Sequence, residues 1–543
     1  MKVKKVPSYS VGPGISCLPL AWGYLTFLAL FALSPAPAGA NEALLKQGEE
    51  YLDAWRLPQA DEIAARLLRE NPKSPEALDF TARIRLHQGR YEEALRSAEQ
   101  ALNTESKDER RQALRLLAQQ TLDTTKKLKR YESSHFALFL EEQRDGILAS
   151  YALETLERSR ESIGKALGYF PEGKVRVEIA PDVASFNAIS TLSVKDIEGT
   201  GAVGICKFNK IMTISPRTLM HGYRWLDSLS HEYLHFVIVG LSDNKAPIWL
   251  HEGMARFYET AWRRRNPAPD EEDYLTPANQ TLLARALEKN QFVGFKKMEP
   301  SLIYLETPEE VQLAYAEAAS AIDFIHRRKG APGLRTLLAE LKRKPTTEAI
   351  EQLFASSFGA FETEWKKFLK EKGLKPIEGS RVRKLKVKTN QKDDEEMVEL
   401  REIQSVVARN RTHLGDELLG RGRAVAASQE YQRALQASPH SPVILNKLAR
   451  VLIQRDKYDE ALPHLKKARD LEPDHVSTYI QLGRLYHAKK NHPEARAALE
   501  EAIQINPFNP LIHRLLSDVY AGLGEQDKSK QARATLDRLM KTK

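Results

Sequence analysis

The chain has 543 residues, of which 42% are hydrophobic and 29% are charged, and it contains 28 glycines and 27 prolines. This composition excludes a collagen-like chain, a largely disordered chain and a polytopic membrane protein, and the length predicts three to four domains at roughly 150 residues each. The formal net charge of +9 is too dilute over this length to indicate a nucleic-acid partner.

The first forty residues have the features of an export signal. Three of the first five residues are lysines, residues 15–33 are mostly apolar, and residues 34–40 end in an Ala-x-Ala cleavage pattern. We therefore expect residues 1–40 to be a signal peptide and the mature protein to be periplasmic or extracellular, without membrane association. The alternative is an uncleaved N-terminal anchor, because the apolar run approaches the length that spans a bilayer.

The cysteine count limits the chemistry of the mature chain. The two cysteines are Cys17, in the expected signal, and Cys206. A single remaining thiol cannot form an internal disulfide and cannot supply a cysteine-based zinc site.

A repeat of 34 residues runs through the C-terminal third. Two positions recur at this spacing: Pro439, Pro473 and Pro507, and Ala427, Ala461 and Ala495. Small residues let two antiparallel helices approach closely, and proline ends the second helix. The pattern resembles the tetratricopeptide repeat (TPR) over roughly 408–540, with a degraded last copy. We therefore expect TPR repeats over 408–543.

The N-terminal region carries the same signal, since Ala60 and Ala94 are again 34 residues apart. We expect TPR-like helical repeats over 41–130, with an unrelated helical bundle as the alternative. Such arrays present concave surfaces that bind proteins, so we expect a protein partner. We also expect the arrays to position substrates or partners, so that deletion of 408–543 would leave the cleavage of a short peptide largely intact.

The residues between the arrays alternate between strand and helix patterns. Short apolar segments predict strands at 136–140, 175–179, 201–206 and 211–214, with a helix near 146–168 between the first two. Long helices are expected from about 222 to 370. The segment 133–373 is therefore expected to be an α+β domain.

A charged linker, 374–407, follows this segment. It is basic over 381–392 and then acidic from Asp393 to Glu396. Such a block most often forms a solvated connector. The alternative is a segment that binds a partner or an anionic surface.

The residues with catalytic potential are His231-Glu-Tyr-Leu-His235, an H-E-x-x-H sequence. On a helix, residues four apart share a face, so both imidazoles can bind one metal ion. Glu232 is then placed to accept a proton from a water molecule.

A catalytic zinc site needs a third protein ligand and one open position. Pro247 predicts the start of a second helix, in which Glu252 lies sixteen residues beyond His235. A helix, a short loop and a returning helix would bring Glu252 beside the two histidines. The neighbouring His251 is a rival ligand, but it cannot face the same way as Glu252.

H-E-x-x-H followed by W-L-x-E-G-x-A is similar to the gluzincin metallopeptidases of the Peptidase MA-like group, over about 133–373. The resemblance implies a zincin-like α+β domain with one zinc ion held by His231, His235 and Glu252, with Glu232 as the general base. It also implies that Tyr315 stabilises the oxyanion. An edge strand within 202–214 would hold an extended peptide.

The expected activity is thus hydrolysis of peptide bonds in proteins or peptides by an exported zinc metallopeptidase. The amine-binding motif of the aminopeptidases is not visible, so exopeptidase specificity is not implied. The alternative function is a non-catalytic exported TPR scaffold whose peptidase-like domain binds peptide. Tyr315 could instead be a core aromatic residue, and His135, His221 and Glu259 are candidates to support the metal ligands.

Overall fold

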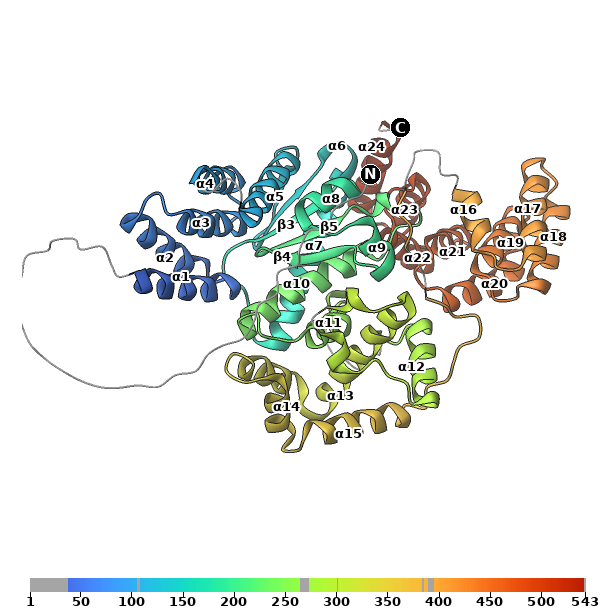
Figure 1. The fold of residues 1–543 in the computed structure, drawn as a ribbon. Helices are drawn as coiled ribbons and strands as arrows, with labels where there is room; N and C mark the ends of the chain where they lie inside the picture. Colours follow the sequence, from blue (N-terminus) through green and yellow to red (C-terminus); the bar gives the residue numbers. More distant parts are fainter. Residues whose placement is uncertain are drawn as a thin grey trace, which may run out of the picture.

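The computed structural model describes residues 38–104, 108–263, 273–299, 301–382, 385–388 and 395–541. A helical array lies at each side of a central domain that contains a small β-sheet (Figure 1). The expected signal peptide lies outside the described residues except for its last three positions. In the described part of the chain, no helix combines the length and apolar character needed to cross a membrane.

The N-terminal array consists of antiparallel helices packed side by side. Its helices are α1 (Ala38–Asp53), α2 (Leu57–Glu70), α3 (Pro75–His87), α4 (Tyr91–Thr104) and α5 (Glu109–Thr125). The alanines that define the repeat, Ala60 and Ala94, are fully buried. A Cβ atom at Gly48 would lie 2.7 Å from the Phe80 ring, so a residue without a side chain is needed where α1 approaches α3.

The central domain contains a five-stranded sheet with the order β1-β2-β3-β5-β4. The strands are β1 (Lys129–Glu132), β2 (Phe136–Leu140), β3 (Val175–Ala180), β4 (Gly204–Lys207) and β5 (Lys210–Ile214). The three inner strands are parallel, and both edge strands, β1 and β4, are antiparallel to their neighbours. The four predicted strands are confirmed. β1 was not predicted, because Lys-Arg-Tyr-Glu is a polar and largely exposed edge sequence.

A tight hairpin joins β4 to β5. Phe208 and Asn209 form its two-residue turn, with φ angles of 56° and 55°, the conformation that matches the twist of an antiparallel pair. The hairpin fixes the register in which Gly204 lies opposite Thr213. It makes β4 the outer edge of the sheet on the side of α10.

Helices surround this sheet and build the remainder of the domain. They are α6 (Glu142–Asp145), α7 (Ala149–Leu167), α8 (Val183–Ser190), α9 (Val194–Thr200), α10 (Trp225–Ser242), α11 (Ile248–Tyr258), α12 (Pro277–Lys289), α13 (Pro308–Glu340), α14 (Thr346–Phe354) and α15 (Phe358–Glu371), with short 3-10 turns between several of them. One apolar core joins the sheet to α7, α10, α11 and α13. α10 crosses this core, so its side chains are buried on nearly all faces.

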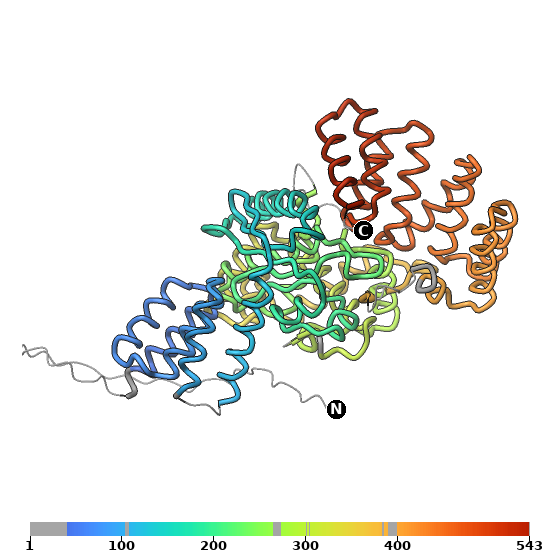
Figure 2. Tube along the Cα trace, turned by 90° about the horizontal axis from the view of Figure 1, so that it is seen from above, coloured from blue at the N-terminus to red at the C-terminus, as the bar shows by residue number. Residues whose placement is uncertain are grey.

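The C-terminal array contains four helix pairs, preceded by the short helix α16 (Glu395–Glu402). The pairs are α17 (Val406–Gly420) with α18 (Ala424–Ala437), α19 (Pro442–Gln454) with α20 (Tyr458–Leu471), α21 (Val476–Ala488) with α22 (His492–Ile505), and α23 (Pro510–Gly522) with α24 (Gln526–Lys541). Figure 2 shows them as a curved stack on the side of the central domain opposite the N-terminal array.

The linker is not the solvated connector expected from its charges. Val387 is 8% exposed and forms an antiparallel bridge with Leu219. Leu400 and Ile403 are 4% and 2% exposed because they pack into the core of the C-terminal array. These few apolar residues attach the described parts of the linker to the folded protein, while the described charges Arg381, Lys386 and Arg401 are exposed.

Candidate metal centre

The site is built on α10 and α11. His231 and Glu232 of α10 are only 9% and 6% exposed, because this helix crosses the core. Asp243 and Asn244 follow α10 with φ angles of 52° and 59°, which reverse the chain direction. α11 therefore returns beside α10 and brings Glu252 to the same place.

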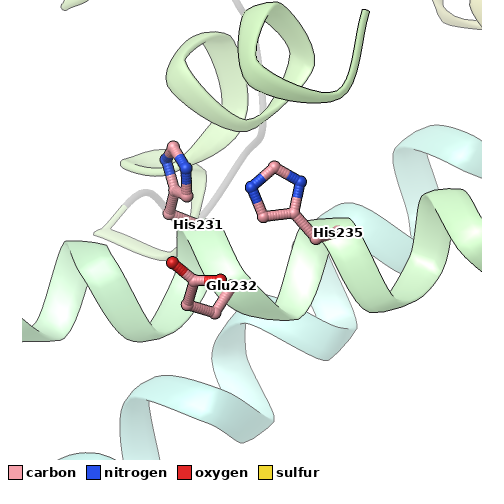
Figure 3. Close-up of side chains that lie close together, drawn as sticks. All are labelled: His231, Glu232 and His235. Carbon is pink, nitrogen blue, oxygen red and sulfur yellow. The ribbon is translucent and has the colours of Figure 1, made fainter. Parts of the chain in front are cut away.

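The two histidines and Glu252 meet there as the spacing predicts. The Nε2 atom of His231 lies 3.3 Å from one oxygen of Glu252, and the Nε2 atom of His235 lies 3.8 Å from the other. Figure 3 shows both imidazoles projecting from one side of α10, with Glu232 next to them. One ligand atom from each of His231, Glu232 and His235 can be chosen so that all lie within 4.8 Å of one another.

The other ring nitrogens of the two histidines are also engaged. Nδ1 of His231 lies 2.9 Å from an oxygen of Glu259, and Nδ1 of His235 lies 3.3 Å from Nδ1 of His251. His251 thus meets the ring nitrogen of His235 that does not face Glu252, which argues against it as a rival ligand. A carboxylate on Nδ1 fixes the orientation of an imidazole whose Nε2 faces a metal.

Of the three candidate supporting residues, only Glu259 lies at the site. His135 is paired with Glu157 at 2.7 Å, and His221 lies 3.5 Å from Glu402. The sequence could not show which of the three candidates lies at the site, because the partners of His135 and His221 come from distant parts of the chain.

The carboxyl group of Glu232 lies against the edge strand β4. A Cβ atom at Gly204 would be 2.7 Å from one oxygen of Glu232, so glycine leaves the space that this carboxyl group occupies. The second oxygen, Oε2, is buried without a hydrogen-bond partner among the described residues. Burial, reinforced by the charge of Glu252, raises the pKa of Glu232 to about 8 although His231 opposes this. This group can therefore hold or release a proton near neutral pH.

The charges at the site favour a cation. Burial disfavours a charge on His231, but the carboxylates of Glu252 and Glu259 outweigh it and raise the pKa of His231 to about 9. Burial likewise opposes a charge on Glu252, yet the two histidines hold its pKa near 2. The carboxylates of Glu252 and Glu259 therefore face imidazole nitrogens at this site.

Tyr315 of α13 belongs to the same charged cluster. The guanidinium carbon of Arg256 lies 4.9 Å from the centre of the Tyr315 ring. Burial, with the charge of Glu252, raises the pKa of Tyr315 above its ordinary value. Its hydroxyl therefore stays protonated and can donate a hydrogen bond. Arg256 was not predicted as a site residue. It lies four residues after Glu252 on α11, and this spacing, which places both residues on one face of the helix, could have indicated it.

The residues fit a zinc ion. Two imidazole nitrogens and one carboxylate form a ligand set that zinc uses in catalytic sites, with a fourth position open. The buried Oε2 atom of Glu232, which has no protein partner among the described residues, indicates a group that completes the site. His231, His235 and Glu252 would hold the ion, and Glu232 would lie beside it.

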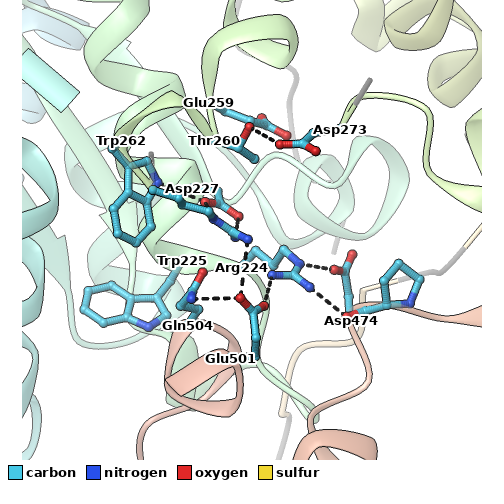
Figure 4. Close-up of polar contacts among 12 residues, drawn as sticks. Arg224, Trp225, Asp227, Glu259, Thr260, Trp262, Asp273, Asp474, Glu501 and Gln504 are labelled. Carbon is cyan, nitrogen blue, oxygen red and sulfur yellow. Dashed lines mark hydrogen bonds and ion pairs between the residues drawn. The ribbon is translucent and has the colours of Figure 1, made fainter. Parts of the chain in front are cut away.

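Ion pairs and hydrogen bonds connect the C-terminal array to the start of α10 (Figure 4). Arg224 pairs with Asp474 and with Glu501, the latter at 2.8 Å, and Trp225 donates its indole hydrogen bond to the backbone oxygen of Ile503 at 2.9 Å. The array therefore holds the end of the helix that carries the two histidines.

A second connection passes through Asp227, one helical turn before His231. Its Oδ1 atom accepts hydrogen bonds from Trp262 at 3.0 Å and from Arg263 at 2.9 Å, and Arg263 also lies 3.6 Å from Glu501. One carboxylate of α22 thus contacts both arginines, Arg224 and Arg263, at the base of the site.

The N-terminal array contacts the β4–β5 hairpin and the neighbouring strand β3. Glu178 of β3 and Lys210 of β5 form a buried ion pair at 2.8 Å, and the Lys210 ammonium also donates to the Tyr91 hydroxyl at 2.9 Å. Burial opposes a charged Glu178, but Lys210 and Arg176 lower its pKa to about 2. Tyr91 of α4 therefore joins the array to β5, the strand that pairs with β4.

Comparisons with known proteins identify the repeats. Family models described as tetratricopeptide repeat match residues 45–119, 418–462 and 452–519. A curated relative from Mycosarcoma maydis, small glutamine-rich tetratricopeptide repeat-containing protein 2, is 26% identical over 113 residues, which are 21% of this chain and 32% of that protein. The STIP1 homolog of Dictyostelium discoideum is 26% identical over 119 residues, which are 20% of this chain and 21% of that protein.

Among solved structures, a thermophilic TPR protein of Thermus thermophilus is 28% identical, with a TM-score of 0.23 over 25% of this chain and 74% of its own. The Cut9–Hcn1 structure of the APC/C is 10% identical, with a TM-score of 0.26 over 93% of this chain and 80% of its own. The chain spans about a third or less of the length of the two curated relatives. The family-model matches show that both arrays contain TPR repeats, in accordance with the sequence pattern, and repeats of this kind present surfaces that bind other proteins.

Proposed function

We propose that this chain is an exported zinc-dependent peptidase whose catalytic domain is carried between two TPR arrays. The observation that supports it best is the convergence of His231, His235 and Glu252 beside the buried, unpartnered oxygen of Glu232 in the described part of the chain. The export signal expected in residues 1–40 supports the location.

The residues of the chain account for each part of peptide hydrolysis. His231, His235 and Glu252 would hold a zinc ion, which would supply polarisation of the scissile carbonyl group and acidification of a water molecule. Glu232 Oε2 accepts the proton of the attacking water and delivers it to the departing amine. Tyr315 donates a hydrogen bond to the oxygen that becomes negative.

The edge strand β4 is positioned to hold the substrate. It has a partner, β5, on one side only among the described strands, and Gly204 of this strand lies against Glu232. An extended peptide can pair with the free backbone groups of such an edge. A peptide bound in this way would lie beside the carboxyl group that we propose to move the proton.

The proposal is tested by the metal content of the purified protein. We expect about one zinc per chain by elemental analysis, since the ligands form a single site. His231→Ala should lose the zinc, because the variant keeps only two of the three ligands. The matched control is His135→Ala, whose imidazole is paired with Glu157 and should not affect the zinc. Full zinc in a folded His231→Ala variant would remove the assignment.

Tyr315→Phe should lower turnover about 10²–10³-fold and change the Michaelis constant less, because the hydroxyl acts mainly on the transition state. The measurement is steady-state cleavage of a fluorogenic peptide, with zinc content verified. An unchanged turnover number with one zinc would return Tyr315 to the role of a core aromatic residue.

A second function, a non-catalytic scaffold that binds peptide, is favoured by the comparisons, because the residues matched by the family models lie in the arrays. Digestion of a peptide library with the zinc-loaded protein separates the two functions. Products that disappear when the zinc is chelated support the peptidase, whereas peptide binding without products supports the scaffold.

A further inference from the structure

Arg256 contacts two of the residues that surround the proposed metal site. Its guanidinium carbon lies 4.9 Å from the centre of the Tyr315 ring. Its Nη1 atom donates to both oxygens of Glu259, at 3.3 and 3.4 Å. Glu259 in turn lies 2.9 Å from Nδ1 of His231. Arg256 therefore connects the carboxylate that orients a metal-binding histidine to the tyrosine on α13.

The packing of α11 against α13 brings Arg256 to Tyr315. A Cβ atom at Gly253 would lie 2.6 Å from the backbone oxygen of Ala318, so a residue without a side chain is needed where these two helices approach each other. Arg256 lies three residues after Gly253 on α11, and Tyr315 lies three residues before Ala318 on α13. The two side chains therefore meet beside the point of closest approach, where the crossing of two packed helices sets their contact.

The proposed oxyanion donor and the metal ligands come from three different helices. His231 belongs to α10, Glu252 to α11 and Tyr315 to α13. A donor of this kind is effective only when it is held within about 0.5 Å of its productive position. A side chain that contacts both the tyrosine ring and the carboxylate behind His231 can keep the three helices in this relation.

An arginine is suited to make both contacts at once. Its planar guanidinium group can donate to a carboxylate and also lie against an aromatic ring. The Nε atom of Arg256 is buried and has no hydrogen-bond partner in the part of the chain that the structure describes. A buried donor without a partner is unfavourable, which argues that Arg256 is retained for its contacts with Glu259 and Tyr315.

We propose that Arg256 is a positioning residue, which holds Glu259 against His231 and holds the Tyr315 ring beside the metal ligands. It acts through these two residues, so its removal should affect both the binding of the metal and the stabilisation of the oxyanion. The expected effect on turnover rests on the proposed peptidase function. The two contacts themselves can be tested without activity.

The first measurement is steady-state cleavage of a fluorogenic peptide by Arg256→Gln at saturating zinc. We expect turnover to fall about 10–100-fold, the usual effect of removing a residue that supports a metal site, with a smaller change in the Michaelis constant. In Arg256→Gln/Tyr315→Phe the loss should fall well short of the product of the two single losses, since the hydroxyl through which Arg256 acts is already absent. A loss equal to that product would overturn the proposal.

Two further measurements need no activity. The zinc affinity of Arg256→Gln, determined by competition with a chromogenic chelator, should weaken about tenfold or more, because Glu259 loses the donor that holds it. With fluorotyrosine incorporated at position 315, the fluorine NMR chemical shift should change in the same variant. A wild-type value in either measurement would overturn the proposal. A zinc-loaded wild type that cleaves no peptide would refute the proposed function alone, and these two measurements would still decide the role of Arg256.

The matched control is Arg160→Gln on α7. The guanidinium carbon of Arg160 also lies 4.9 Å from an aromatic ring, that of Phe170, and its Nε atom is likewise buried without a partner among the described residues. This variant should keep the wild-type turnover, zinc affinity and fluorine shift, and equal changes in both variants would overturn the proposal. If thermal melting shows that Arg256→Gln is unfolded, Arg256→Lys takes its place. Lysine keeps the charge but not the planar fork, so the same changes should be smaller.

Discussion

Glu232→Gln should abolish most of the peptidase activity while the protein keeps its zinc and its fold. The amide has nearly the shape of the carboxyl group but cannot accept a proton at neutral pH, and loss of a general base typically costs about 10²–10⁴-fold in rate. The glutamate is already surrounded closely by Gly204 and the helix, so an isosteric replacement fits the same space. Cleavage of a fluorogenic peptide and elemental analysis of the same preparation provide the two readings.

The matched control for this variant is Glu154→Gln on α7, an exposed glutamate whose side chain is 69% accessible. It should retain the wild-type rate. Wild-type turnover in Glu232→Gln would mean that the proton of the water leaves by another route, and the assignment of Glu232 would then be withdrawn. Loss of zinc together with activity would make Glu232 a ligand, a role that its position next to His231 and His235 also permits.

Local sequence patterns predicted the parts of the site that lie close together in the chain. The four-residue spacing of His231 and His235 places both on one face of a helix, whatever the remainder of the fold. Glu252 could be found because a helix, a tight reversal and a second helix leave few possible arrangements. The buried strands β2, β3 and β5 were likewise visible, since their apolar runs are local.

Contacts between distant residues could not be predicted in the same way. Arg224 and Asp474 are 250 positions apart, and Tyr91 and Glu178 are 87 apart. Each of these residues has the ordinary character of a surface side chain in its own segment, and only the packing of the arrays against the domain brings it to its partner. Glu259 could likewise be predicted only as a candidate partner of His231. The two residues are 28 positions apart, and such a spacing does not determine whether their side chains meet.

The connections of the C-terminal array change the expectation for its removal. A chain ending at residue 407 loses the partners of Arg224 and the oxygen that Trp225 bonds, and it uncovers Trp225, which is 1% exposed in the full chain. An indole that loses its burial costs several kcal/mol at about 25 cal/mol per Å² of apolar surface. Arg263, which pairs with Asp227, also loses its contact with Glu501. The first turn of α10 would thus lose its contacts with the array. His231 lies less than two helical turns further along the same helix.

We therefore expect residues 41–407 alone to bind zinc weakly and to lose the cleavage of short peptides, in contrast to the intact cleavage that the repeat pattern suggested. Zinc content, thermal unfolding and cleavage of a fluorogenic peptide are compared between 41–407 and 41–543. Glu501→Gln tests the same connection without truncation. It should destabilise the domain by about 1–3 kcal/mol, because two partly buried guanidinium groups lose a charged partner, and lower the melting midpoint by about 2–4 °C for each kcal/mol.

Glu494→Gln, an exposed change on the same helix, is the matched control and should melt with the wild type. A 41–407 fragment with the zinc content, midpoint and peptide cleavage of the full chain would show that the array is an independent module. The sequence alone permits that result, but the bonds from Asp474, Glu501 and Ile503 to the base of α10 argue against it. In the folded protein these bonds make the array part of the support of α10, so a partner bound on the array would act on a structure that is continuous with the proposed metal site.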